Sequence, residues 1–90
     1  MKQQKVKTIT YNIQISSNDK IALVSNMHTM LTSGIPILET VESLLEDSKG
    51  GLKKLLQTMR QDLGQGQHIY ITYAKFPKVF DKVTVNIIKS

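Results

Sequence analysis

The 90-residue sequence contains no cysteine and no tryptophan, and it has only two prolines and five glycines. Without cysteine the chain cannot form a disulfide framework, a thiolate nucleophile or a sulfur-ligated metal site. No apolar run approaches the roughly 20 residues that a helix needs to cross a bilayer. The N-terminus also lacks the continuous apolar stretch of a signal peptide. The composition therefore indicates one small domain with a thin core, which leaves self-association into a homodimer open.

Charge is distributed unevenly along the chain, whose formal net charge is +5. Residues 21–48 carry four acidic side chains and no base, whereas residues 1–20, 49–66 and 67–90 each have a net charge of +3. A uniformly basic chain would indicate nucleic acid or an anionic lipid surface as its partner. An acidic segment between basic ones instead predicts neighbouring elements that complement each other, with some positive surface left over.

Glycine clusters divide most of the chain into helical segments. Gly34 can adopt the left-handed conformation that closes a helix, and Pro36 suits the first turn of the next one. Gly50-Gly51 and Gly64-Gln65-Gly66 are the next two breaks. Between the breaks, apolar residues recur at helical spacing and predict helices over about 19–33, 36–47 and 52–63. The candidate N-caps of the first helix are Ser17, Asn18 and Asp19.

The last third of the chain has a weaker pattern. Residues 68–73, HIYITY, combine helical spacing with β-forming side chains, so strand and helix are equal alternatives there on propensity alone. Phe76-Pro77 predicts a break, because a residue before proline avoids the α region. A final helical stripe runs to the end of the chain without a C-cap signal, as in a chain that ends inside an element. This stripe consists of Phe80, Val83, Thr84, Ile87 and Ile88.

The first 16 residues alternate between apolar and polar side chains, with Ile9, Tyr11, Ile13 and Ile15 on one side. A lone strand has no partner in this sequence, so the alternation predicts an extended arm or a flexible leader rather than a sheet. We therefore expect a leader over residues 1–18 and a helical domain over residues 19–90. The predicted fold class is all-α, a small antiparallel helical bundle with an extended N-terminal arm.

The sequence offers no catalytic, cofactor-binding or metal site. His28 and His68 have no acid or second histidine at the spacing of a metal pair. No nucleophile elbow and no glycine-rich phosphate loop is present. The clustered carboxylates lie along one helix face, which spreads them too far apart to converge on a cation, so a solvated face is the better interpretation.

Two charged helix faces are the candidate partner-binding surface. The acidic face belongs to the second expected helix and the basic face to the third, and an antiparallel pair would let the two faces meet along their edges. The basic face could also be a recognition helix for DNA, although the polar face of an amphipathic helix is the simpler interpretation. The residues of this surface are Glu39, Glu42, Glu46, Lys53, Lys54 and Arg60.

Two blocks of the sequence resemble the F-protein family of type II secretion systems, whose members are inner-membrane platform proteins of secretion and type IV pilus machines. The first block, residues 23–37, reads LVSNMHTMLTSGIPI, and the second, residues 66–81, reads GQHIYITYAKFPKVFD. Ser25-Asn26 replaces an Arg-Gln pair of the family, and bulky side chains follow Gly66 where the family has small ones. The family positions that match are Gly34, Ile35, Pro36, Gly66, Pro77 and Phe80.

The resemblance implies a non-enzymatic cytoplasmic domain that contacts the assembly ATPase and couples it to pilin assembly. It implies part of a six-helix bundle, which favours helix for HIYITY. It also places the full-length protein, a multi-pass membrane protein, in the bacterial inner membrane, with this domain on the cytoplasmic face and other inner-membrane components as partners. No cofactor and no nucleic acid is expected. The alternative function is a small basic helical nucleic-acid-binding module.

Overall fold

The computed structural model describes residues 9–89, which form five helices and no strand. This confirms the all-α prediction and resolves HIYITY as helix. None of the five helices is long and apolar enough to cross a membrane. They are α1 (Ser17–Thr32), α2 (Ile37–Leu45), α3 (Gly50–Gly64), α4 (Ile69–Lys75) and α5 (Lys82–Lys89).

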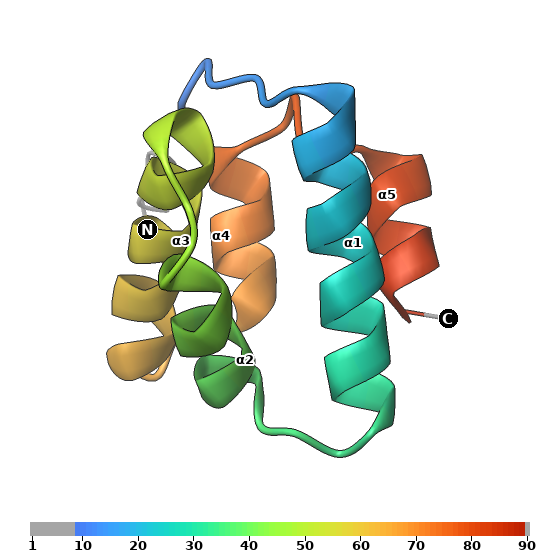
Figure 1. Ribbon diagram of the computed structural model, residues 1–90. Helices are drawn as coiled ribbons and strands as arrows, with labels where there is room; N and C mark the ends of the chain where they lie inside the picture. The colour runs from blue at the N-terminus through green and yellow to red at the C-terminus, as the bar shows by residue number, and fades with distance from the viewer. Residues whose placement is uncertain (1–8, 90) are drawn as a thin grey trace.

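Successive helices alternate in direction, as Figure 1 shows. The chain descends through α1, rises through α2, descends through α3 and rises again through α4. The connection after α4 then crosses at the top, so α5 descends beside α1 and runs in the same direction (Figure 1). The molecule thus has an α1–α5 pair on one side and α2, α3 and α4 on the other.

The corner between α1 and α2 forms by local backbone bonding. Gly34 has a φ of 85°. Its N–H donates to the carbonyl of Leu31, and the Ile35 N–H donates to the carbonyl of Met30 at 3.0 Å. This 6→1 and 5→2 pair is the Schellman motif, which satisfies carbonyls that the helix end would leave unpaired. Gly34 thus closes α1 as expected.

The sequence predicts Pro36 in the first turn of α2, but the residue lies just before the helix. Its ψ is 142°, so its backbone is extended and it occupies the N-cap position, with Ile37 as the first helical residue. Its carbonyl accepts from both the backbone N–H and the hydroxyl of Thr40, at 3.0 and 3.2 Å. The helix also ends at Leu45, two residues before the expected end. The first helix is capped by Ser16, whose hydroxyl accepts from the Asp19 N–H, rather than by residues 17–19.

Helix α3 ends with the same Schellman motif as α1. Gly66 has a φ of 81°. Its N–H donates to Leu63, and the Gln67 N–H donates to the carbonyl of Asp62. The chain then turns into α4, where the Nδ1 atom of His68 accepts from the Tyr70 N–H at 3.2 Å. Two Schellman corners therefore set the directions of four of the five helices.

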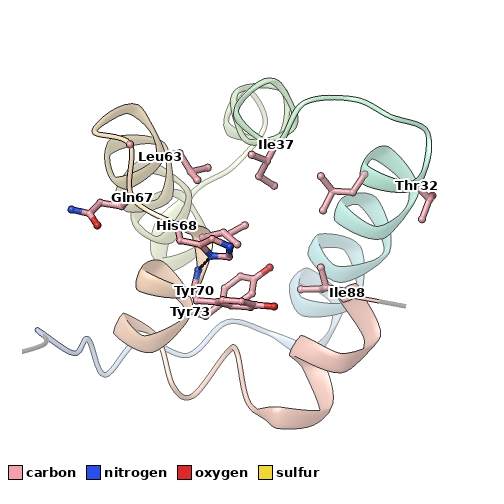
Figure 2. Close-up of a pocket in the computed structure, with 11 residues that line it drawn as sticks. Thr32, Ile37, Leu63, Gln67, His68, Tyr70, Tyr73 and Ile88 are labelled. Atoms are coloured by element: carbon pink, nitrogen blue, oxygen red, sulfur yellow. Dashed lines mark hydrogen bonds between the residues drawn. The ribbon is translucent and has the colours of Figure 1, made fainter.

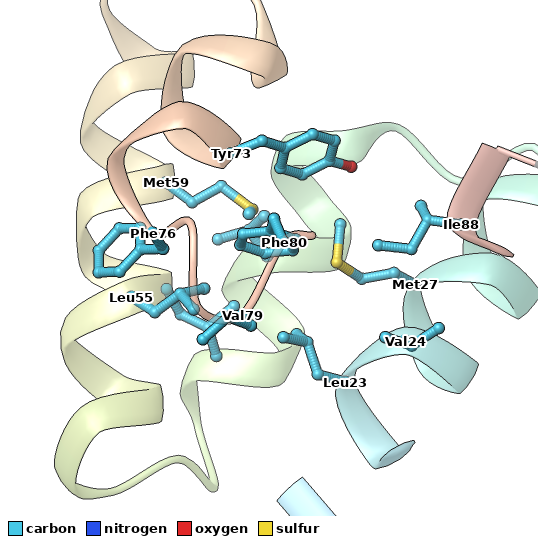
Figure 3. Packing of buried hydrophobic residues seen from close by; sticks show 12 residues of the cluster. Leu23, Val24, Met27, Leu55, Met59, Tyr73, Phe76, Val79, Phe80 and Ile88 are labelled. Atoms are coloured by element: carbon cyan, nitrogen blue, oxygen red, sulfur yellow. The ribbon is translucent and has the colours of Figure 1, made fainter. Parts of the chain in front are cut away.

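The core forms where the connection between α4 and α5 inserts between the two sides. Figure 3 shows Val79 and Phe80 between Met59 of α3 and Met27 of α1. Both methionines are fully buried, as is Phe76. The remaining buried apolar residues are Leu23, Val24, Val41, Leu55, Leu56, Tyr73 and Ile88.

The apolar stripe expected for the last helix is only partly correct. Thr84 and Ile88 are buried, but Val83 is 67 % exposed and Ile87 49 % exposed. Asp81 explains the orientation of the helix start, because its carboxylate accepts from the Thr84 N–H at 2.8 Å. That bond lowers the pKa of Asp81, with help from Lys20. The cap turns Thr84 inward, which leaves Val83 on the outer side.

Residues 9–16, which we call the arm, are extended and make no strand, as predicted. The arm crosses the top of the molecule from α3 to the start of α1 (Figure 1). Tyr11, Ile13 and Ile15 are half-buried against the core, while Ile9 is exposed. The part of the predicted leader before Ile9 lies outside the described residues.

Gly34→Ala should lower the free energy of unfolding by about 1–2 kcal/mol, because a Cβ is strained at this left-handed position. Gly64 is a matched control, since its φ is not positive and an added Cβ would meet nothing within 4 Å. Gly64→Ala should be neutral or stabilising by about 0.5–1 kcal/mol. Urea unfolding followed by circular dichroism measures both changes, and equal losses in the two variants would contradict this account of the corner.

Candidate functional site

The predicted acidic face is present on α2. Glu39, Glu42 and Glu46 are all exposed and lie three and four residues apart, so they form a continuous acidic ridge along the outer side of the helix. The buried side of the same helix carries Thr40 and Val41. The sequence therefore placed the acidic ridge correctly on the solvent side.

The predicted basic face is present on α3. Lys53, Lys54 and Arg60 are exposed and form a basic ridge on the side of α3 opposite its buried leucines. The Lys54 Nζ atom lies 5.1 Å from the centre of the Tyr11 ring, an aromatic contact that holds this lysine beside the arm.

The two ridges do not pair with each other, which corrects the expectation that they meet along their edges. Within residues 9–88 the salt bridges join Lys20 to Asp81 at 3.4 Å and Lys75 to Asp62 at 2.8 Å. Helices α2 and α3 pack through their apolar sides, which turns both ridges outward. Opposite charges on neighbouring helices thus stay available to other molecules.

The negative charge continues into a groove of about 390 Å³ between α1 and α2. Asp19 and Asp47 line it, together with apolar side chains such as Leu23 and Leu44. Within the described part of the chain, no lysine or arginine lines this groove. Its charge therefore has the same sign as that of the acidic ridge.

A second concave feature is a cleft of about 670 Å³ at the opposite end from the arm. We call it the aromatic cleft. Figure 2 shows the rings of Tyr70 and Tyr73 projecting from α4 into a space bordered by Ile37 of α2 and Ile88 of α5. Among the residues that the structure describes, no acidic side chain, lysine or arginine lines it. The other lining residues are Leu31, Thr32, Leu63, Gly66, Gln67, His68 and Ile69.

The aromatic side chains of α4 form a continuous series of ring contacts. The His68 ring stacks on Tyr70 with centroids 4.5 Å apart, Tyr70 meets Tyr73 edge to face at 5.7 Å, and Tyr73 stacks on Phe80 at 4.4 Å. The sequence had marked the bulky residues after Gly66 only as departures from a family pattern. Their helical spacing was visible, but the cleft depends on how α1 and α5 lie across from α4.

Buried polar contacts fix α4 on α3 and so position the cleft wall. Asp62 of α3 is 5 % exposed. Its carboxylate accepts from the Thr72 hydroxyl and from the Lys75 ammonium of α4, both at 2.8 Å. Both carboxylate oxygens are thereby satisfied, as a buried charge requires.

No arrangement for catalysis or metal binding stands out in the described residues. Among them, no group of three or more histidine, aspartate or glutamate side chains could hold a metal ion. His68 serves as the cap of α4. The Nδ1 atom of His28 on α1 is buried without a hydrogen-bond partner in this part of the chain.

A protein-family model described as "Type II secretion system (T2SS), protein F" matches residues 23–90. The chain belongs to this family. No curated protein and no solved structure matches it. The match confirms the family suggested by the two sequence blocks, and this family is a structural platform family.

The T2SS protein F match begins within α1, so it includes all of α2 to α5 and both Schellman corners. Of the family positions expected to be structural, Phe80 is buried in the core and Pro77 is exposed in the turn before it. Ile35 is half-buried at the first corner. The arm lies outside the matched residues.

Asp62→Ala should lower the free energy of unfolding by about 2–4 kcal/mol, because it leaves the partly buried Lys75 ammonium and the Thr72 hydroxyl without their partner. Glu42→Ala is the control, since it removes an exposed carboxylate and should change stability by less than about 0.5 kcal/mol. Urea unfolding compares the two variants. If both shift equally, the buried contact does not fix α4.

Burial raises the pKa of Tyr73 to about 12, with a smaller contribution from Tyr70. Its ordinary value is 10.0, so the folded chain holds this proton more tightly than the unfolded chain. The stability from this group is complete below pH 10 and is lost as the pH rises to about 12.

Over that pH range, the free energy of unfolding of the wild-type chain should fall by roughly 2 kcal/mol more than that of Tyr73→Phe. Denaturant unfolding between pH 9 and pH 12 measures the difference, with the phenylalanine variant correcting for the other groups that titrate there. Identical pH profiles of the two chains would contradict the burial of this hydroxyl.

Proposed function

We propose that this chain is the cytoplasmic domain of an inner-membrane platform protein, and that it binds the assembly ATPase of its machine through the acidic and basic ridges. The machine is one for type II secretion or type IV pilus assembly. In this role the domain is a scaffold that couples the ATPase to pilin assembly and carries out no chemistry itself.

The observation that carries the proposal is the pair of ridges that stay unpaired within the described residues. A folded domain can lower its own energy by pairing opposite charges on neighbouring helices. Here Glu39, Glu42 and Glu46 face solvent beside a helix whose Lys53 and Arg60 also face solvent. Exposed rows of negative and positive charge on neighbouring helices favour a partner that presents the complementary pattern of charges.

Family membership supports the rest of the proposal. A platform protein must hold other components in fixed positions, and a rigid helical domain with two defined corners suits that task. We place the domain, residues 19–90, on the cytoplasmic face of the bacterial inner membrane, with further inner-membrane components as partners. The full-length protein would be embedded in the membrane.

The alternative of a small basic helical nucleic-acid-binding module has less support. The basic ridge on α3 has the exposure that phosphate contacts need. However, the acidic ridge lies on the next helix, and Asp19 and Asp47 extend the negative charge on the far side of α2. These carboxylates repel a phosphate backbone that approaches α3.

Charge reversal of either ridge should weaken binding to the cognate assembly ATPase by about tenfold or more, because long-range attraction becomes repulsion. The variants are Glu39→Lys/Glu42→Lys/Glu46→Lys and Lys53→Glu/Lys54→Glu/Arg60→Glu, compared with the wild-type chain by co-purification and by titration at low salt. The wild-type affinity should also fall as salt is raised.

The control is Lys78→Glu/Lys82→Glu, which reverses two exposed charges outside both ridges. It should bind like the wild-type chain. Circular dichroism and urea unfolding establish that all variants keep the fold. Full binding by both folded ridge variants would direct the search to other surfaces, and binding lost equally in the control would show a non-specific charge effect.

A further inference from the structure

The arm occupies a well-defined seat on the domain, although it precedes the family-matched residues. The seat is formed by the start of α3 and by the residues that end α4. The arm is attached to α1 and crosses to α3, so it links the two sides of the molecule at the end where it lies (Figure 1).

Tyr11 is the residue that the seat recognises most fully. Its ring stacks on Phe76, with centroids 5.1 Å apart and planes 22° from parallel. The Lys54 Nζ atom lies 5.1 Å from the same ring. The backbone N–H of Tyr11 donates to the Lys75 carbonyl at 2.7 Å. Stacking, a cation over the ring and a main-chain bond together select an aromatic residue in an extended backbone.

Gly51 sets the shape of the seat next to Ile13. A Cβ added at this glycine would lie 2.9 Å from the Ile13 Cγ2 atom and 3.5 Å from the Gln14 carbonyl oxygen. A Cβ at position 51 therefore clashes with the Ile13 methyl group, and a smaller side chain at position 13 relieves that clash. The seat accepts an extended segment with the pattern aromatic-x-aliphatic-x-aliphatic, in which the apolar residues are half-buried and Asn12 and Gln14 are exposed.

We propose that this seat is an exchangeable binding site, and that in a dimer the arm of a second copy of this chain occupies it. The second copy carries the same Tyr11, Ile13 and Ile15, so every contact seen within one chain can form between two chains. Reciprocal exchange fills both seats and closes with two-fold symmetry. This inference does not depend on the ATPase contact proposed above.

The attachment of the arm makes exchange accessible. Among residues 9–15 of the described chain, a single backbone hydrogen bond joins the arm to the helices, from Tyr11 to Lys75. The arm continues into α1 directly after the Ser16 cap, so it can swing away without opening a helix. Since the contacts within one chain and between chains are equivalent, a chain's own arm fills its seat at low concentration. Exchange is expected at high protein concentration, approaching the effective concentration of the attached arm, which is roughly millimolar for a short linker.

The lack of cysteine allows a direct test of the exchange. Ile13→Cys and Gly51→Cys are made in separate full-length chains, mixed at high concentration and oxidised slowly. If a bound arm brings the two thiols together, covalent dimers should form about tenfold faster than from a control mixture of Ile13→Cys and Gln57→Cys. Gln57 is an exposed residue farther along α3.

A second measurement keeps the test decisive if Gly51→Cys does not fold. Unmodified chains with and without isotope labels are unfolded, mixed and refolded, and filtered nuclear Overhauser spectra then detect only contacts between copies. Contacts of the Tyr11 ring with Phe76 across copies are expected in this mixture. A Tyr11→Ala chain should lose any dimer seen by sedimentation. Disulfide formation at the control rate, or filtered spectra without these contacts, would overturn the proposal.

Discussion

The structure depends on the burial of a non-helical segment. Phe76, Val79 and Phe80 come from the connection between α4 and α5, and they fill the space between α3 and α1. Two of the backbone N–H groups in this connection are satisfied within it, since the carbonyl of Phe76 accepts from both Val79 and Phe80. The turn can therefore enter the core without the cost of unpaired backbone groups. These side chains pack the α1–α5 pair against the rest of the domain.

The helices and corners were predictable because their determinants are local. A glycine in the left-handed region and apolar residues at helical spacing act within a few positions of themselves. The sequence therefore predicts the closure of α1 at Gly34 and a break at Gly64-Gln65-Gly66, where the second Schellman corner lies. The orientation of α5 was not predictable from spacing, because only four of the five stripe residues lie in the helix and Phe80 belongs to the connection before it. The Asp81 cap and the contact with α1 decide which of them face inward.

The sequence predicts which residues form the candidate surface, but it does not predict whether the acidic and basic ridges pair with each other. Charges three and four residues apart must share a helix face, so the exposure of both ridges followed from the sequence. Whether two faces meet depends on the rotation of each helix about its axis, which is set by buried residues such as Val41 and Leu55. The aromatic cleft and the seat of the arm combine distant segments, and no local pattern in the sequence describes them.

The outward ridges have a consequence for motion in solution. With negative charge on α2 and positive charge on α3, the domain carries an electric dipole that points across the two helices rather than along them. A charged neighbour exerts a torque on such a dipole before any contact is made, and this torque orders the tumbling molecule within about a Debye length of the neighbour. The domain would therefore approach a partner with one side already turned toward it, which shortens the rotational search that limits most protein encounters.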